Sequence, residues 1–114
     1  MTQPIKVSDW EQQLRELLPN WDGEGADLPS EEAINKTKEI VAWANLHNLD
    51  IESIDPDVLG GTGIYLRGVN NRTAWIAILN HQNPTIVITQ DRRTTGCRVD
   101  EQSLEGLKLF LTVD

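Results

Sequence analysis

The chain has 114 residues, of which 39% are hydrophobic and 25% charged, a composition typical of one globular domain with one core. That domain is expected to span residues 1–114, and an intrinsically disordered chain is excluded. No apolar run approaches the roughly 18 residues needed to cross a bilayer, and the N-terminus lacks the apolar stretch of a secretory signal. A cytoplasmic protein without membrane contact is therefore predicted.

The net charge of −8 is unevenly distributed along the chain. Residues 1–57 contain thirteen acidic and four basic residues, whereas residues 58–114 contain five acidic and six basic ones. An acidic surface repels phosphates and favours basic protein surfaces or cations. The imbalance predicts a partner with a basic surface and disfavours direct binding to nucleic acid.

Two helices are predicted in the first half of the chain. The first begins at the capping box that Ser8 and Glu11 form, and it ends at Pro19. Its apolar stripe consists of Trp10, Leu14, Leu17 and Leu18. The second begins after the N-cap Ser30 and runs to about Asn45. Its buried face is expected at Ala33, Ile34, Thr37, Ile40, Val41 and Ala44.

The second half changes to β-branched residues and paired turn residues. Strands are predicted over 63–69, 73–79 and 85–89, and 95–99 is a candidate fourth strand at the edge. Asp100 is expected to cap a last helix, whose apolar side consists of Leu104, Leu107, Phe110 and Leu111. The predicted fold is α+β, with two N-terminal helices, a three- to four-stranded antiparallel meander and a C-terminal helix, the helices packed on one face.

The loop between the two N-terminal helices is the main candidate site. It contains Trp21 and three carboxylates, Asp22, Glu24 and Asp27, separated by glycines. In a structural interpretation, Trp21 plugs the core between the helices, Asp22 caps a tight turn and the glycines adopt positive φ. In a functional interpretation, the loop presents Trp21 with an acidic rim to a protein partner. A third interpretation is a calcium-type cation site, although the spacing differs from that of a helix-loop-helix calcium loop.

The segments Trp21 to Ala26, Pro29-Ser30 and Gly60-Gly61 resemble a diffuse set of small bacterial and phage-associated proteins. These proteins carry a Trp-Asp-Gly-x-Gly-Ala loop, Pro-Ser before a helix and a glycine-rich entry to a short sheet. The resemblance covers most of the chain in layout, and it implies the order of the elements but no activity. The chain departs from that pattern at Tyr65-Leu66-Arg67, where an acidic-aromatic strand ending is usual.

Few residues suggest catalysis. His47, near a helix end, and His81, in a turn, are expected to be solvated, and Cys97 is expected to be a half-buried thiol without a catalytic role. Neither Ser53 nor Ser103 has a base at a recognised spacing. The carboxylates around Pro56 could hold a metal for nuclease chemistry, or line a solvated loop; they are Asp50, Glu52, Asp55 and Asp57. The arginines near the last turn could bind an anion, or protect an edge strand from pairing; they are Arg92, Arg93 and Arg98.

The leading functional hypothesis is a small acidic, non-enzymatic interaction module. It would act as an inhibitor, an antitoxin or an immunity-type partner that binds a basic protein surface through Trp21, Asp22, Glu24 and Asp27, with no cofactor. The first alternative is a small-molecule or metal-ion binding module that uses the same loop, and the second is a metal-dependent enzyme. Trp75 lies in a strand that is apolar on both sides, which suggests a homodimer.

Overall fold

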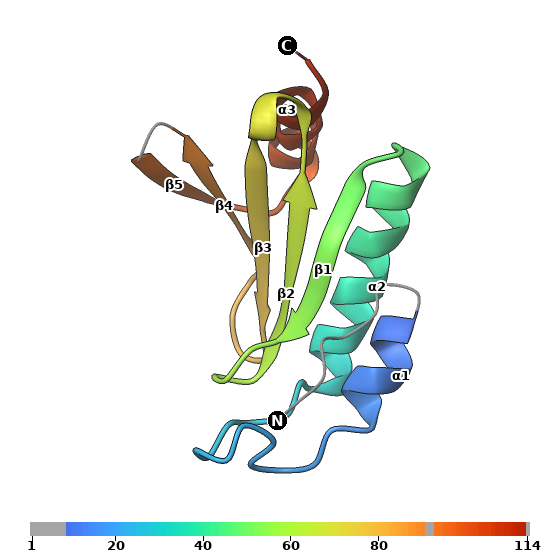
Figure 1. Cartoon of the computed structure of the whole chain (residues 1–114), viewed down its shortest axis with the longest axis vertical. Helices are drawn as coiled ribbons and strands as arrows, with labels where there is room; N and C mark the ends of the chain where they lie inside the picture. Colours follow the sequence, from blue (N-terminus) through green and yellow to red (C-terminus); the bar gives the residue numbers. More distant parts are fainter. Residues whose placement is uncertain (1–8, 91–92, 114) are drawn as a thin grey trace.

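The computed structural model describes residues 9–90 and 93–113 as an α+β fold in which helices cover one face of a sheet (Figure 1). In chain order the elements are α1 (Trp10–Arg15), α2 (Glu31–Leu46), β1 (Asp50–Pro56), β2 (Gly61–Arg67), the short 3-10 turn η2 (Val69–Asn71), β3 (Thr73–Leu79), β4 (Thr85–Gln90), β5 (Arg93–Arg98) and α3 (Glu101–Thr112). None of the helices in the described part is sufficiently long and apolar to span a bilayer.

The sheet is an antiparallel meander of five strands in the order β1-β2-β3-β4-β5. The prediction of three or four strands was wrong because it left out β1, in which the acidic residues have low strand propensity. β1 lies at an edge of the sheet, where one side of the strand faces solvent and tolerates charge. A bulge between Ile51 and Ser53 inserts Glu52 and shifts the register at that point.

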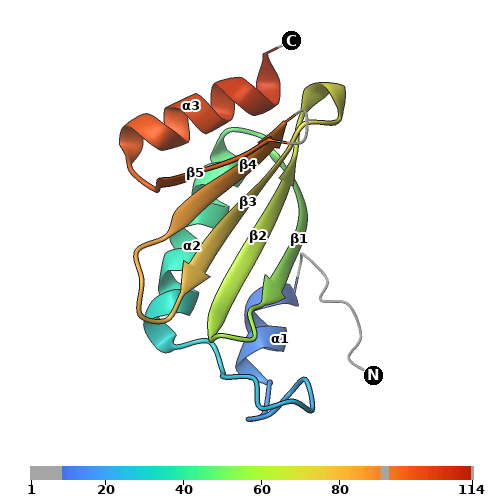
Figure 2. The same cartoon turned by 90° about the vertical axis from the view of Figure 1, so that its left-hand side faces the viewer.

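The core lies between α2 and one face of the sheet (Figure 2). All six residues predicted for the buried face of α2 are buried. They pack against alternate residues of the strands, namely Ile54, Thr62, Ile64, Leu66, Ala74, Ile76, Ile78 and Ile86. Two fully buried hydroxyl groups, those of Thr37 and Thr62, lie 2.6 Å apart within this apolar layer. Each therefore satisfies a polar group that would be costly to bury alone.

The first helix is shorter than predicted. It ends at Arg15, with Glu16 as the C-cap, and Leu18 is 75% exposed. Pro19 explains the difference, because its ring would clash with the carbonyl of Arg15 and disfavours a helical conformation at Leu18. Ser8 lies outside the described residues, and the N-cap Asp9 makes no side-chain capping bond.

Local signals correctly predicted two other features. Asn70 and Asn71, both with positive φ, close the turn between β2 and β3 in the manner of a type I′ turn. Asp100 caps α3: its carboxylate accepts the backbone N–H of Ser103 at 2.7 Å, and the Ser103 hydroxyl accepts the backbone N–H of Asp100 at 2.8 Å. Leu107 and Leu111 then attach α3 to the core.

The cap of α3 predicts a pH-dependent contribution to stability. The backbone N–H of Ser103 is the main cause that lowers the pKa of Asp100. A carboxyl with a lowered folded-state pKa stabilises the protein above its unfolded pKa, near 3.9, and loses that contribution as pH falls through the folded value. Asp100→Ala should therefore lower the melting temperature at pH 7, and its difference from the unmodified protein should shrink in acid.

Thermal denaturation followed by circular dichroism, from pH 7 down to about pH 2, measures this difference. Gln102→Ala is the matched control, because that side chain is exposed in the same turn and forms no capping bond. It should change the melting temperature little at any pH. If the melting temperature of Asp100→Ala stays below that of the unmodified protein by the same amount in acid, the stabilising role of the ionised Asp100 carboxylate is contradicted.

Candidate functional site

The loop between α1 and α2 is closed by bonds from its own side chains to its backbone. Asp22 Oδ1 accepts the backbone N–H groups of Glu24 at 2.8 Å and Ala26 at 3.0 Å. Asn20 Oδ1 accepts the backbone N–H of Gly25. The predicted turn chemistry is confirmed, since Asp22 caps the turn and both loop glycines, Gly23 and Gly25, have positive φ.

Trp21 occupies a different place from the one that the structural interpretation gave it. It is half-buried and does not belong to the core between the helices. Its indole N–H donates to the carbonyl of Asp27 at 2.9 Å and so spans the two ends of the loop. A tryptophan bound in this way stabilises the loop, while its side chain stays partly exposed.

Asn80, in the loop after β3, attaches the Trp21 loop to the sheet. Its Oδ1 accepts the backbone N–H of Ser30 at 2.7 Å, and its Nδ2 donates to the carbonyl of Leu28 at 2.8 Å. Its own backbone N–H donates to the carbonyl of Gly60 in the β1–β2 hairpin at 3.0 Å. Sequence analysis missed Asn80, because its side-chain contacts join residues about fifty positions apart and leave no local pattern.

The β1–β2 hairpin lies beside the Trp21 loop and adds exposed apolar side chains to it (Figures 1 and 2). The backbone N–H of Asp27 donates to the carbonyl of Val58 at 3.1 Å. Val58 is 53% exposed and Leu59 is 69% exposed. Together with the exposed acids Glu24 and Asp27, they form what we call the end surface. Val58 and Leu59 were missed because apolar residues in a turn give no signal of their exposure.

The carboxylates of the loop do not form a cation site. Asp22 uses one oxygen for two backbone N–H groups, and Asp57 Oδ1 accepts the backbone N–H of Leu59 at 2.8 Å. Glu52 on β1 forms an ion pair with Arg67 at 2.7 Å. The described residues contain no group of three or more His, Cys, Asp or Glu that could hold a metal ion. The carboxylates around Pro56 are thus spread along β1 and the turn that follows it, rather than convergent.

The residues considered for catalysis have other roles or stand apart. His47 is the C-cap of α2 and its ring lies 5.5 Å from that of Trp43. Ser103 caps α3, and His81 is exposed. Cys97 is exposed rather than half-buried, because it lies on the edge strand β5. Of the predicted arginine cluster, Arg92 lies outside the described residues.

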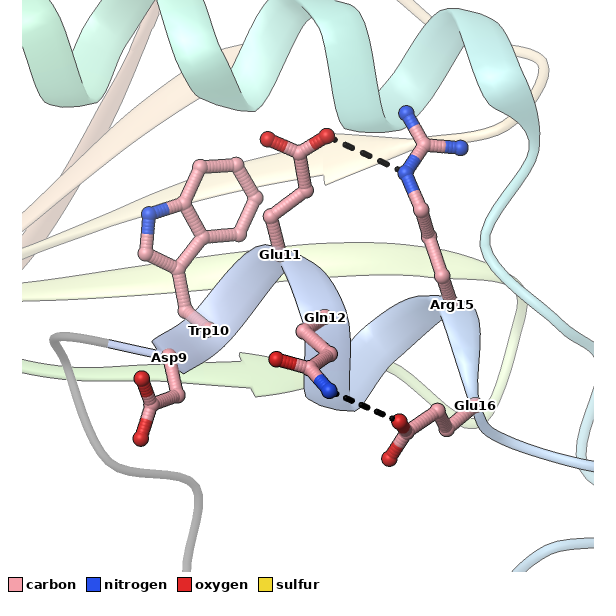
Figure 3. A pocket seen from close by; sticks show the side chains of 6 residues that line it. All are labelled: Asp9, Trp10, Glu11, Gln12, Arg15 and Glu16. Atoms are coloured by element: carbon pink, nitrogen blue, oxygen red, sulfur yellow. Dashed lines mark hydrogen bonds and ion pairs between the residues drawn. The ribbon is translucent and has the colours of Figure 1, made fainter.

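A depression beside α1 is lined by Trp10 and by polar residues, of which Glu11 pairs with Arg15 and Gln12 with Glu16 (Figure 3). Arg15 bridges two helices: it lies 3.1 Å from Glu11 on α1 and 2.5 Å from Glu31 on α2. The bonds to Glu31 and Glu11 raise the pKa of Arg15, and the bond to Arg15 lowers the pKa of Glu31. These pairs hold α1 against α2, so their role is structural.

Comparison of the chain with protein-family models, curated proteins and solved structures finds no match. The resemblance to the small bacterial and phage-associated proteins therefore stays a prediction.

The anchoring role of Asn80 yields a test. Asn80→Ala removes two bonds to the loop backbone and should lower the free energy of unfolding by about 1–3 kcal/mol, because partly buried backbone groups lose their partners. Urea denaturation measures this loss, and proteolysis should become faster between Gly23 and Gly25. Asn83→Ala, an exposed position in the same turn, is the control. Equal stability of the two variants would contradict the anchoring role.

Proposed function

We propose that the protein is a small acidic interaction module whose end surface binds a basic protein surface. An inhibitor, an antitoxin or an immunity-type partner is the class of protein that fits this proposal. The observation that carries it is the exposure of Val58 and Leu59 beside Glu24 and Asp27 on two loops that are fixed to the sheet.

The charge of the end surface is of one sign. Residues 20–30 contain three acids and no base, and residues 57–60 contain one acid and no base. The described bases of the first half, in contrast, lie on α1 and α2: Arg15 pairs with Glu11 and Glu31, and Lys38 pairs with Glu11. An acidic surface of this kind attracts a basic partner and accelerates its association.

The apolar centre supports a protein partner rather than a small ion. Exposed aliphatic side chains with a charged rim are typical of interface centres, where a few buried contacts carry most of the binding energy. Both loops are held by side-chain and backbone bonds, so little conformational entropy is lost when a partner orders them. Trp21 and Asp22 therefore act as positioning residues, and the direct contacts are assigned to Glu24, Asp27, Val58 and Leu59.

The direct contacts can be tested without disturbing the loop. A partner is first cross-linked and captured from an extract of the native host with the unmodified chain, and is then purified. The variant Val58→Ser with Leu59→Ser should weaken its dissociation constant by about tenfold or more, since each interface centre residue contributes on the order of 1 kcal/mol. Calorimetry on the purified pair provides the measurement.

The charge contribution requires separate variants and controls. Glu24→Gln with Asp27→Asn should slow association and reduce its dependence on salt. Leu109→Ser and Glu39→Gln are matched controls on α3 and α2, where both residues are exposed, and both should bind as the unmodified protein does. Binding that no end-surface variant changes would refute the proposal, provided that the variants keep their melting temperatures.

A further inference from the structure

The face of the sheet opposite α2 carries a stacked aromatic pair. Tyr65 on β2 and Trp75 on β3 are cross-strand neighbours whose ring centroids lie 5.9 Å apart at an interplanar angle of 19°. Tyr65 is 43% exposed, and Trp75 is half-buried. Figure 2 shows this face turned to the viewer, with α2 behind the sheet. Solvated faces of antiparallel sheets normally carry polar residues, so the aromatic pair marks a contact surface.

The two halves of this open face differ in height. The indole of Trp75 lies over Gly63 on β2, where any Cβ would overlap its nitrogen. Both large rings therefore lie toward β2. On the other side of β3, the register places Val87 on β4 and Gly96 on β5 in the same row as Trp75. Since these side chains are smaller, the face is raised over β2 and low over β4.

The two edges of the open face differ in charge, as its two halves differ in height. One row across the sheet consists of Asp55, Gly63, Ala77, Thr85 and Arg98. The register thus places an acidic residue at the β1 end of the row and a basic residue at the β5 end, with small side chains between them. Within the described part of the chain neither Asp55 nor Arg98 forms an ion pair, although the charge of Arg98 contributes to lowering the pKa of Asp100. Arg98 is exposed at the free edge, where it also borders the cleft between α2 and α3.

We propose that the open face is the contact surface of a symmetric homodimer whose two-fold axis runs along β3, between the two sheets. This rotation keeps each row at its level and exchanges its ends. The raised half over β2 then meets the low half over β4, and Arg98 of the partner subunit lies over Asp55. Because a two-fold contact repeats itself, two such ion pairs form.

The dimensions permit this pairing. Strands are about 4.8 Å apart and packed sheets about 10 Å apart, so β1 and β5 lie roughly 10 Å to either side of β3. Aligned sheets cross at about 30°, which tilts the two-fold axis by about 15° from β3. This crossing displaces the end of each row by about 5 Å, within the reach of an arginine side chain. The face measures roughly 20–25 Å on each side, and about 1,000 Å² in total is at the lower limit of specific interfaces. The dimer is therefore weak and dependent on concentration.

Two other uses of this part of the sheet agree less well with the charges. β5 contains no acidic residue, so symmetric pairing of two β5 edge strands would leave Arg98 without an opposite charge and bring like charges together, which is destabilising. Nucleic acid would need several free cations, but Arg67 is paired with Glu52 and the chain carries a net charge of −8. Contact between open faces is thus the arrangement that the charges favour.

Sedimentation velocity over a range of concentrations tests the dimer through charge exchange. The mass of the unmodified chain should rise from 12.8 kDa toward twice that value. Asp55→Lys and Arg98→Glu should each remain monomeric, because like charges then face each other, whereas the double variant should dimerise again. Tyr65→Lys should also be monomeric, and Leu109→Lys, at an exposed position on α3, is the control that should dimerise normally.

Several results would overturn the dimer. One is a monomeric unmodified chain at all concentrations, and another is a dimer that Tyr65→Lys leaves intact. A double variant that stays monomeric while its melting temperature matches that of the unmodified protein would exclude the proposed axis. Retention of a labelled single-stranded RNA by a monomeric chain would assign the face to nucleic acid. All these variants lie outside the end surface, so this proposal and the proposed function can fail independently.

Discussion

The hydroxyl groups of Thr37 and Thr62 lie 2.6 Å apart in the middle of the core, and this contact fixes how α2 crosses the sheet. Both side chains are fully buried, and Thr37 also donates to the carbonyl of Ala33 at 2.7 Å. Sliding or rotation of α2 would leave the buried hydroxyl of Thr62 without this partner, and an unpaired buried hydroxyl group is costly. The rest of the molecule is arranged around this fixed helix.

One consequence is the position of the Trp21 loop. Because α2 begins at a fixed level relative to β2, the segment that leads to Ser30 must pass the end of the sheet at the β1–β2 hairpin. Asn80 then binds both sides of this junction, the loop through Leu28 and Ser30 and the hairpin through the backbone of Gly60. The end surface is therefore attached to the sheet on both of its sides, although it consists of loops.

The sequence predicted what depends on local chemistry. The α+β class, the buried face of α2, the Asn70-Asn71 turn, the Asp22 turn and the Asp100 cap each result from residues close together in the chain. The prediction failed where contacts between residues distant in the chain determine the structure. β1 was left out because its charges are tolerated only at a sheet edge, and the structural interpretation of the loop placed Trp21 in a core to which it does not belong.

The residues of the end surface likewise divide into those that local sequence predicted and those that only the fold shows. Glu24 and Asp27 were selected because acidic residues and glycines are conspicuous in a loop, and both are exposed. Val58 and Leu59 were not selected, since two apolar residues between β-strands normally indicate burial. Only the fold shows that the hairpin ends at the surface, beside Asp27. The apolar half of an interface is therefore harder to predict from sequence than its charged half.

The direction of the proposed two-fold axis connects the two surfaces. A rotation about an axis along β3 exchanges the edges of the sheet but keeps its two ends, so both end surfaces would lie at the same end of the dimer. A partner with two basic sites, or a dimeric partner, would then be bound twice, and the second contact would form at a high effective concentration. Occupancy of both end surfaces by such a partner would itself favour the dimer. Tight binding of the partner is therefore compatible with weak self-association and with a small end surface.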